Sequence, residues 1–238
     1  RRRMSVSTLI FLAVGLVVIA VLAWGSASIR SDLYLHALCR GGRNERSVAL
    51  TFDDGPDPVR TPEVLDVLAR YGVRATFFLV GEKAAAYPDL VRRIVAEGHV
   101  VGNHTHTHKG FFPLYGSRRI AGEIRSAGEV LHAITGRRPR FFRPPFGVTN
   151  PAIGRSVRRA GLATVGWSIR SLDTVTRTPR ETVLARVLGK LHPGAVILLH
   201  DRCPRSAWLT ERLLEALGKR GYSVNTVERM FDIDAYED

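Results

Sequence analysis

Cysteine is scarce in this chain, with two residues among 238. So low a number argues against a small scaffold held together by several disulfides. Low-complexity stretches are also few, and 45% of the residues are hydrophobic, which argues against a disordered chain. A chain of this length and composition is expected to form one domain with a substantial hydrophobic core.

Acidic residues are few as well, since 22 Asp and Glu stand against 35 Lys and Arg and leave a formal charge of +13. Such an excess first suggests a nucleic-acid partner. The arginines are spread along the chain, however, and no recognised basic motif is interleaved with aromatic residues, so no nucleic-acid partner is predicted. The charge instead favours a place beside an anionic envelope or membrane surface.

Charge is absent between Met4 and Ile29, where the apolar run Leu9–Trp24 follows three arginines. The uncharged stretch is near the length that crosses a bilayer and is longer than the usual apolar part of a signal peptide. Arginines before it and few after it place the N-terminus inside and the rest of the chain outside. We therefore predict a transmembrane signal anchor over residues 1–25 of a single-pass cell-membrane protein.

A cleaved signal peptide is the alternative, with Gly25-Ser26-Ala27 as a small-residue cleavage site. Both interpretations place the remaining chain beyond the cytoplasmic membrane, in a periplasmic or extracellular space. Residues 26–46 contain Gly, Ser and Arg with little periodicity, so they are predicted to be a tether. A folded domain is then expected over residues 47–238.

Short apolar runs alternate with amphipathic stretches along this domain. SVALTFDD and AVILLHD are typical of buried strands, and ATVGWSI is predicted to be a further strand. TPEVLDVLARYGV is typical of a helix, with Thr61 as its predicted N-cap, and SRRIAGEIRSAGEVLHAITG is predicted to be a long helix that ends at Gly136. This alternation predicts an α/β protein, a parallel sheet covered by helices, with about seven units, one fewer than a complete eight-unit barrel. An open doubly wound sheet is the alternative, but no glycine-rich phosphate loop follows the first strand.

Ionisable residues follow the predicted strands at the points where the strands end. They are Asp53, Asp54, His104, His108, Arg143, Asp173 and His200. In a parallel α/β barrel the carboxyl ends of all strands gather on one face. We therefore expect these side chains, which come from five separate segments, to converge around one site.

The segment HTHTH places His104 and His108 four residues apart, and a helical turn would bring both imidazoles to one face. That spacing alone is a weak signal, because surface helices contain it by chance. With an aspartate on the same rim, two histidines and one carboxylate satisfy three positions of a zinc ion and leave the rest for water or substrate. Cobalt or nickel fits the same donors.

Asp53 and Asp54 stand side by side, which allows one carboxylate to bind the metal while the other takes a proton from water. The two tasks need different carboxylates, because a carboxylate neutralised by a metal is a poor base. Arg143 would keep the base ionised and oriented. His200 would protonate the leaving group, and Asp173 would raise its basicity. A plain turn is the alternative for the acid pair, since Asp, Gly and Pro are ordinary turn formers.

Five short motifs follow one another along the predicted domain. They are TFDDG at 51–55, HTHTH at 104–108, RPPFG at 143–147, WSIRSLD at 167–173 and LLH at 198–200. In this order they resemble the motifs of the polysaccharide deacetylases with a NodB-homology domain, also called carbohydrate esterase family 4. The resemblance implies a distorted (β/α) barrel with about seven parallel strands, in agreement with the number of units counted above.

The resemblance also implies a role for each matching residue. Asp53 is the implied general base and Arg143 its partner, while His200 is the implied general acid and Asp173 its tuning partner. The implied ligands of a zinc ion, or of another divalent transition metal such as Co²⁺, are Asp54, His104 and His108.

Three further residues are implied to contact the substrate. The backbone N–H of Phe146 would help to hold the oxyanion, and Trp167 and Leu198 would wall the pocket for the acetyl methyl group. The fourth motif departs from the D-x-x-D-W pattern common in the family. Arg170 stands in the first acidic place and Thr174 in the place of the tryptophan, which bears on the choice of sugar but not on the metal or the base.

The activity implied by the resemblance is metal-dependent removal of N-acetyl groups from an envelope or extracellular amino-sugar polymer, such as peptidoglycan or a chitin-like oligosaccharide. An O-acetyl esterase acting on xylan-type substrates and a barrel that binds glycan without turnover stay open. The expected partners are the polysaccharide and, through the N-terminal helix, the membrane. Pairing of Cys39 with Cys203 is left open: an oxidising compartment allows it, but the two are expected near opposite faces of the barrel.

Overall fold

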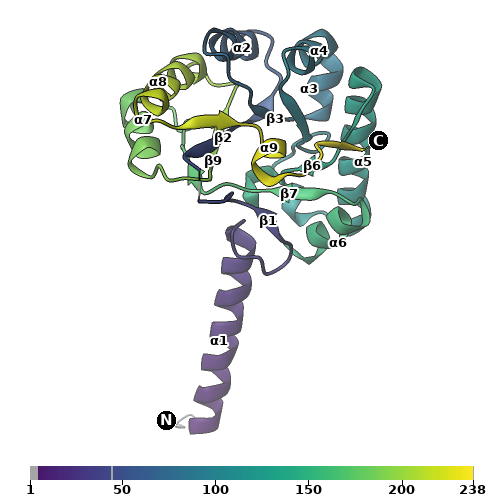
Figure 1. Cartoon of the computed structure of the whole chain (residues 1–238). Coiled ribbons are helices and arrows are strands. Elements are labelled where there is room, and N and C mark those ends of the chain that lie inside the picture. The colour runs from purple at the N-terminus through teal and green to yellow at the C-terminus, as the bar shows by residue number, and fades with distance from the viewer. Residues whose placement is uncertain (1–4, 44, 238) are drawn as a thin grey trace.

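The computed structural model describes residues 5–43 and 45–237. Over these residues nine strands form one sheet in the order β1-β7-β6-β4-β3-β2-β9-β8, with β10 paired to β2, and the ladders between them are parallel. The sheet curls into a distorted barrel that helices surround (Figure 1). The predicted α/β barrel is therefore confirmed.

The strands that carry the site lie at the centre of the sheet. β2 (Ser47–Gly55) is buried along its whole length and pairs with β3 (Thr76–Leu79) on one side and β9 (Ala195–His200) on the other. β4 (Val100–Asn103) lies beyond β3. Because parallel strands are covered on both faces, their sequences are almost continuously apolar, as predicted.

The large sheet has two more strands than the seven predicted. The run ATVGWSI, predicted as one strand, splits into β7 (Ala163–Val165) and β8 (Ile169–Arg170). β7 is second from one end of the strand order, next to β1, whereas β8 is the last strand at the other end. β1 comes from the predicted tether. The remaining strands are short: β1 (Ala37–Leu38), β6 (Phe141–Phe142), β10 (Ser223–Asn225), and the antiparallel pair β5 (Arg138–Pro139) and β11 (Tyr236–Glu237).

The helices of the domain are α2 (Arg60–Arg70), α3 (Gly81–Ala86), α4 (Pro88–Ala96), α5 (Ser117–Thr135), α6 (Pro151–Arg159), α7 (Arg180–Gly189), α8 (Ser206–Lys219) and α9 (Val227–Phe231). As predicted, α5 ends at Gly136, whose φ of 72° favours glycine. The prediction of Thr61 as an N-cap is wrong. Thr61 lies inside α2, and the Asp57 carboxylate accepts from the backbone N–H groups of Val59 and Arg60 instead.

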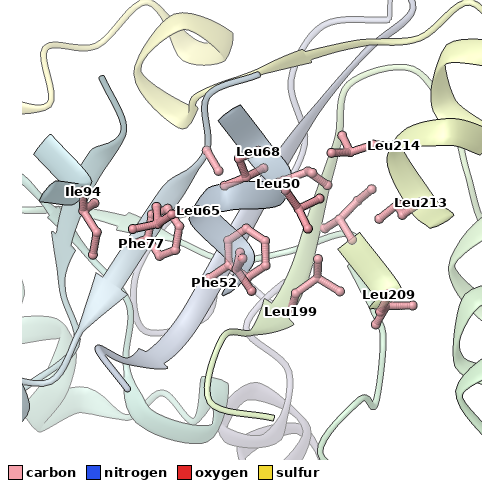
Figure 2. Packing of buried hydrophobic residues seen from close by; sticks show 14 of the residues in the cluster. Leu50, Phe52, Leu65, Leu68, Phe77, Ile94, Leu199, Leu209, Leu213 and Leu214 are labelled. Atoms are coloured by element: carbon pink, nitrogen blue, oxygen red, sulfur yellow. The ribbon is translucent and has the colours of Figure 1, made fainter. Parts of the chain in front are cut away.

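The largest core cluster fills the space between the central strands and the helices α2 and α8 (Figure 2). Leu50 and Phe52 project from β2 into this cluster, and the rings of Phe52 and Phe77 stack with centroids 5.0 Å apart. Burying each such side chain contributes roughly 1.5–3 kcal/mol. The strand that ends in Asp53 and Asp54 is therefore held firmly by its apolar residues.

α1 (Val6–Ala27) projects away from the domain as a single long helix (Figure 1). It is long and apolar enough to cross a membrane, and its apolar window is not buried by the protein. It is therefore a candidate membrane span by length and composition. Residues 1–4 of the predicted anchor lie outside the described residues.

The predicted tether over residues 26–46 is not a free linker. Ile29, Leu35 and Ala37 are buried in a second hydrophobic cluster, β1 pairs with β7, and Arg40 forms a bridge to Ala195 of β9. The apolar residues of this segment follow neither helical nor strand spacing, so periodicity did not reveal them. The segment packs against the domain and helps to close the curled sheet.

Candidate active site

Asp53 and Asp54 line the same cavity although they are neighbours on β2. In a regular strand their side chains would point to opposite faces. Asp54 adopts a left-handed φ of 73°, and the ladder between β2 and β3 shifts register between Asp53 and Gly55. This irregularity brings both carboxylates to the carboxyl end of the strand.

The cavity has a volume of about 570 Å³ and lies at the carboxyl ends of the central strands. Most of the predicted site residues line it: Asp53, Asp54, His104, His108, Phe146, Leu198 and His200. Arg143 and Asp173 are buried behind this lining. Segments that are far apart in the sequence therefore meet at one rim, as expected from the barrel topology.

The side chains of Asp54, His104 and His108 have the geometry of a metal-binding group. Asp54 Oδ1 lies 3.4 Å from His104 Nε2 and 3.3 Å from His108 Nε2, and the three donor atoms lie within 4.8 Å of one another. Tetrahedral zinc with bonds of about 2.0–2.1 Å would place its ligands roughly 3.3 Å apart. Two imidazoles and one carboxylate therefore fit a zinc ion in both chemistry and spacing.

The two histidines come together without a helical turn, which the spacing offered only as one way to bring both imidazoles to one face. The chain after β4 forms an irregular bend in which Thr105 and His108 have positive φ values of 68° and 49°. The two imidazole centroids are nevertheless 4.7 Å apart. Glu123 of α5 holds the bend, because its carboxylate accepts from the backbone N–H groups of His106 and Thr107 at 3.1 and 2.8 Å.

Hydrogen bonds orient these donors. His104 Nδ1 lies 2.7 Å from the carbonyl oxygen of Arg143, and donation to that carbonyl leaves the Nε2 lone pair facing Asp54. The Arg202 Nε–H donates to Asp54 Oδ2 at 2.7 Å, and Lys83 Nζ donates to the backbone carbonyl of Asp54 at 2.6 Å. Sequence reasoning missed Arg202, Lys83 and Glu123, because no motif or spacing marks them.

The electrostatics of the group favour metal binding. Burial opposes the charge of Asp54, but the hydrogen bond and charge of a protonated His104, together with the charge of a protonated His200, outweigh it and hold the pKa of Asp54 well below its usual range. Burial also lowers the pKa of His108 to about 4. At neutral pH the carboxylate is therefore ionised and His108 is neutral, which are the forms that bind metals.

Asp53 has a different environment from Asp54. Its Oδ1 accepts a charge-assisted hydrogen bond from Arg143 Nη1 at 2.6 Å, whereas its Oδ2 lies 3.7 Å from His104 Nε2. The fully buried Arg143 side chain also donates to Thr51 Oγ1 and to the backbone carbonyls of Val165 and Gly166, at 2.8–3.0 Å. These bonds fix the guanidinium, and through it the orientation of the Asp53 carboxylate.

His200 and Asp173 form the second charged pair of the site. His200 Nδ1 lies 2.8 Å from Asp173 Oδ1, and the backbone N–H of His200 donates to Asp173 Oδ2 at 2.7 Å. Burial works to lower the pKa of His200, but the hydrogen bond and charge of Asp173 outweigh it, so the pKa is raised. Asp173 therefore favours the protonated imidazole and fixes its orientation.

Of the three predicted substrate-contact residues, Phe146 and Leu198 line the cavity and Trp167 does not. Phe146 has a left-handed φ of 62°, and its half-exposed ring lies 5.1 Å from that of His108. Leu198 lines the cavity floor from β9. Trp167 is not among the described residues that line the cavity. Its indole packs against Gly147, where an added Cβ would come within 2.3 Å of the ring, so Trp167 supports the Pro145–Gly147 turn from behind.

Asp201 is a buried carboxyl that sequence reasoning also missed. Its Oδ2 accepts from Thr61 Oγ1 at 2.6 Å and lies directly beneath Gly55, where a Cβ would meet it at 2.2 Å. Burial raises the pKa of Asp201 to about 7. At neutral pH this carboxyl is therefore only partly ionised, and it supports the turn that follows the acid pair.

Cys39 and Cys203 are both free thiols, so the structure does not pair them. Cys39 packs against Gly166 and Ile29, whereas Cys203 is buried after β9. Burial raises the pKa of Cys203 to about 12, which makes its thiol unreactive at neutral pH.

The chain is similar to known proteins over most of its length. The profile of a family described as Polysaccharide deacetylase matches residues 40–165. The chain is 38% identical over 208 residues to a chitooligosaccharide deacetylase of Sinorhizobium fredii, covering 82% of this chain and 96% of the relative. It is 35% identical over 195 residues to a peptidoglycan-N-acetylglucosamine deacetylase of Bacillus cereus, covering 80% and 70% respectively. The crystal structure of the Bc1960 peptidoglycan N-acetylglucosamine deacetylase matches with a TM-score of 0.79 and 33% identity, over 84% of this chain and 94% of that one.

Proposed function

The chain belongs to the polysaccharide deacetylase family, and from this premise we propose that it is a metal-dependent hydrolase that removes N-acetyl groups from an amino-sugar polymer. The relatives named above deacetylate chitooligosaccharides or N-acetylglucosamine in peptidoglycan, which supports an N-acetyl substrate. The observation that carries the proposal is that Asp53 and Asp54 have different neighbours. Asp54 faces two imidazoles, whereas Asp53 is paired with the buried guanidinium of Arg143.

Asp54, His104 and His108 would hold the metal, and zinc is the ion that fits their donor set best. When bound, the metal would act as a Lewis acid that polarises the acetamide carbonyl and makes water more acidic. Arg202 would keep Oδ2 of Asp54 occupied, which leaves Oδ1 for the ion.

Asp53 would act as the general base. Arg143 holds Oδ1 through a charge-assisted hydrogen bond, so Oδ2 is the atom that would accept a proton from the attacking water. Asp53 Oδ2 lies 3.7 Å from His104 Nε2, which supports a role beside the proposed metal ligands and separate from theirs.

His200 would act as the general acid. Since Nδ1 faces Asp173, Nε2 is the atom that would give a proton to the amide nitrogen as the carbon–nitrogen bond breaks. The charge of Asp173 stabilises the imidazolium before transfer. The products would be a free amine on the sugar and acetate.

The remaining cavity residues would position the acetamide group. The left-handed turn at Phe146 would direct its backbone N–H toward the developing oxyanion, which a donor placed in advance stabilises strongly. Leu198 offers an apolar contact for the acetyl methyl group. Trp167 would contribute indirectly, by supporting the turn that carries Phe146.

We further propose that α1 is an uncleaved single-pass anchor and that residues 47–238 form the catalytic domain outside the cytoplasm. The alternative cleavage site, Gly25-Ser26-Ala27, makes hydrogen bonds with the folded domain, which supports an anchor that is not cleaved. The carbonyl of Gly25 accepts from Thr149 Oγ1 at 2.8 Å, and that of Ser26 accepts from the Thr149 N–H at 3.0 Å. Cleavage there would remove contacts of the segment that closes the sheet.

Acetate release by the purified full chain tests the proposed activity. We expect release from chitin oligomers and from peptidoglycan, loss of release with a chelator, and recovery when zinc is restored. Acetylated xylan is the matched comparison, because it carries O-acetyl in place of N-acetyl groups. Release from xylan alone would favour an esterase, and no release from any of the three substrates with zinc present would favour a barrel that only binds glycan.

A further inference from the structure

The end of α1 contacts the domain through several hydrogen bonds and one buried glycine. Gly25 is buried against Leu33, and its carbonyl accepts from Ser31 Oγ at 2.9 Å as well as from Thr149. The Tyr34 hydroxyl reaches back to the carbonyl of Leu22, one turn further into the apolar helix, at 3.3 Å. If α1 spans a membrane, these contacts decide which face of the domain lies against the lipid.

Two exposed apolar side chains lie at this junction. Outside α1, Phe111 and Leu114 are the most exposed large apolar side chains of the described residues, at 72% and 80%. They lie on either side of Phe112 and Pro113. Phe112 is buried in the same cluster as Ile29, and the backbone carbonyl of Pro113 accepts from the Asn150 side chain at 2.7 Å. The loop that carries them therefore lies beside the segment on which α1 docks.

Basic side chains occupy the same junction. Arg30 is exposed just after α1, and Arg155 and Arg158 are exposed on α6. The Arg158 guanidinium donates to the carbonyl of Tyr34 at 3.0 Å, so it lies next to the residue that reaches Leu22. α6 carries no acidic residue to offset these charges.

We propose that this junction is a membrane-contact face, on which Phe111 and Leu114 enter the lipid interface while Arg30, Arg155 and Arg158 meet anionic headgroups. Apolar side chains that penetrate the headgroup region, surrounded by basic residues, bind anionic bilayers in this way. The face is continuous with α1, which commits it to the bilayer as its occupant. Because the loop begins directly after His108, the catalytic rim would be held close to the membrane, with access to membrane-proximal glycan.

The test uses the full chain reconstituted in vesicles. An environment-sensitive fluorophore is placed at Phe111→Cys, and a matched control at Tyr87→Cys, which is also exposed but lies near α4, on the side of the domain away from α1 (Figure 1). In vesicles of phosphatidylcholine and phosphatidylglycerol, we expect lipid-borne quenchers to quench the probe at 111 and not the probe at 87. In phosphatidylcholine alone, quenching at 111 should weaken.

Three results would overturn the proposal. Equal, weak quenching at both positions would show that the loop stays in water. The second result concerns a Phe111→Ser, Leu114→Ser variant that also carries a fluorophore at Arg118→Cys. If this variant loses activity on soluble chitin oligomers while quenching of the probe at 118 is unchanged, the loop contacts glycan and not lipid. Failure of the full chain to float with vesicles would reject the anchor, whether or not the protein releases acetate, so this outcome is distinct from failure of the proposed activity.

Discussion

The guanidinium of Arg143 and the carboxylate of Asp53 form a buried ion pair, with Nη1 and Oδ1 2.6 Å apart. Asp54, the next residue, instead faces two imidazoles. Two carboxylates that are adjacent in the chain therefore have different environments. Breaking a buried pair of this kind is costly, because it leaves an uncompensated charge.

Arg143→Lys is expected to lower kcat on an N-acetyl oligomer by about 100-fold, because a lysine keeps the charge but cannot bond to Asp53 and to three other oxygens at once. Steady-state acetate release gives the rate, and a denaturant melt reports any loss of stability. Arg140→Lys is the control, since Arg140 is partly exposed and lies 3.9 Å from Asp234. Equal activity of the two variants would contradict the role of Arg143.

Asp173→Asn is expected to move the alkaline limb of the pH–rate profile to lower pH. Asp173 raises the pKa of His200 against the opposing effect of burial, so its loss lowers that pKa. His200 must be protonated to act as the acid, and a lower pKa removes its proton earlier as the pH rises. An alkaline limb that stays in place would show that His200 is not the acid.

Arg202→Gln is expected to weaken zinc binding by about tenfold, because residues that hydrogen-bond to metal ligands typically contribute 10–100-fold in affinity. Isothermal titration of the metal-depleted protein measures the effect without any need for substrate. Arg212→Gln, on the exposed surface of α8, is the matched control. The same affinity in both variants would exclude Arg202 from orienting Asp54.

Asp201→Asn is expected to flatten the pH dependence of stability. The folded state keeps the Asp201 proton up to about pH 7, whereas an unfolded aspartate loses it near pH 3.8. The folded state therefore binds more protons in this window, and stability falls as the pH rises through it. Relative to the native chain, the variant should gain stability between pH 4 and pH 8 in denaturant melts at constant metal concentration. A constant difference across this range would contradict the assignment.

The parts of the fold that the sequence predicted are those that depend on local pattern. Continuous apolar runs located β2 and β9, and the topology of a parallel sheet then placed Asp53 and His200 at the same end. The five motifs were sufficient to select the candidate residues.

The features that sequence reasoning missed depend on the tertiary fold. The left-handed backbone at Asp54 and the bend after β4 have no periodic signature, because each is imposed by neighbouring segments. Arg202 and Glu123 act on the site from a loop and a helix, and arginine and glutamate are common on both. The buried part of the predicted tether was missed for a similar reason, since its apolar residues have no regular spacing.

The central claim is that Asp54 binds a metal with His104 and His108 while Asp53 stays free as the base. Zinc affinity and acetate release, measured together on Asp53→Asn, test it most directly. We predict zinc affinity close to that of the native chain and a loss of acetate release on the order of 10²–10⁴-fold, the usual contribution of a general base. Undiminished acetate release, or loss of the bound zinc, would contradict the claim.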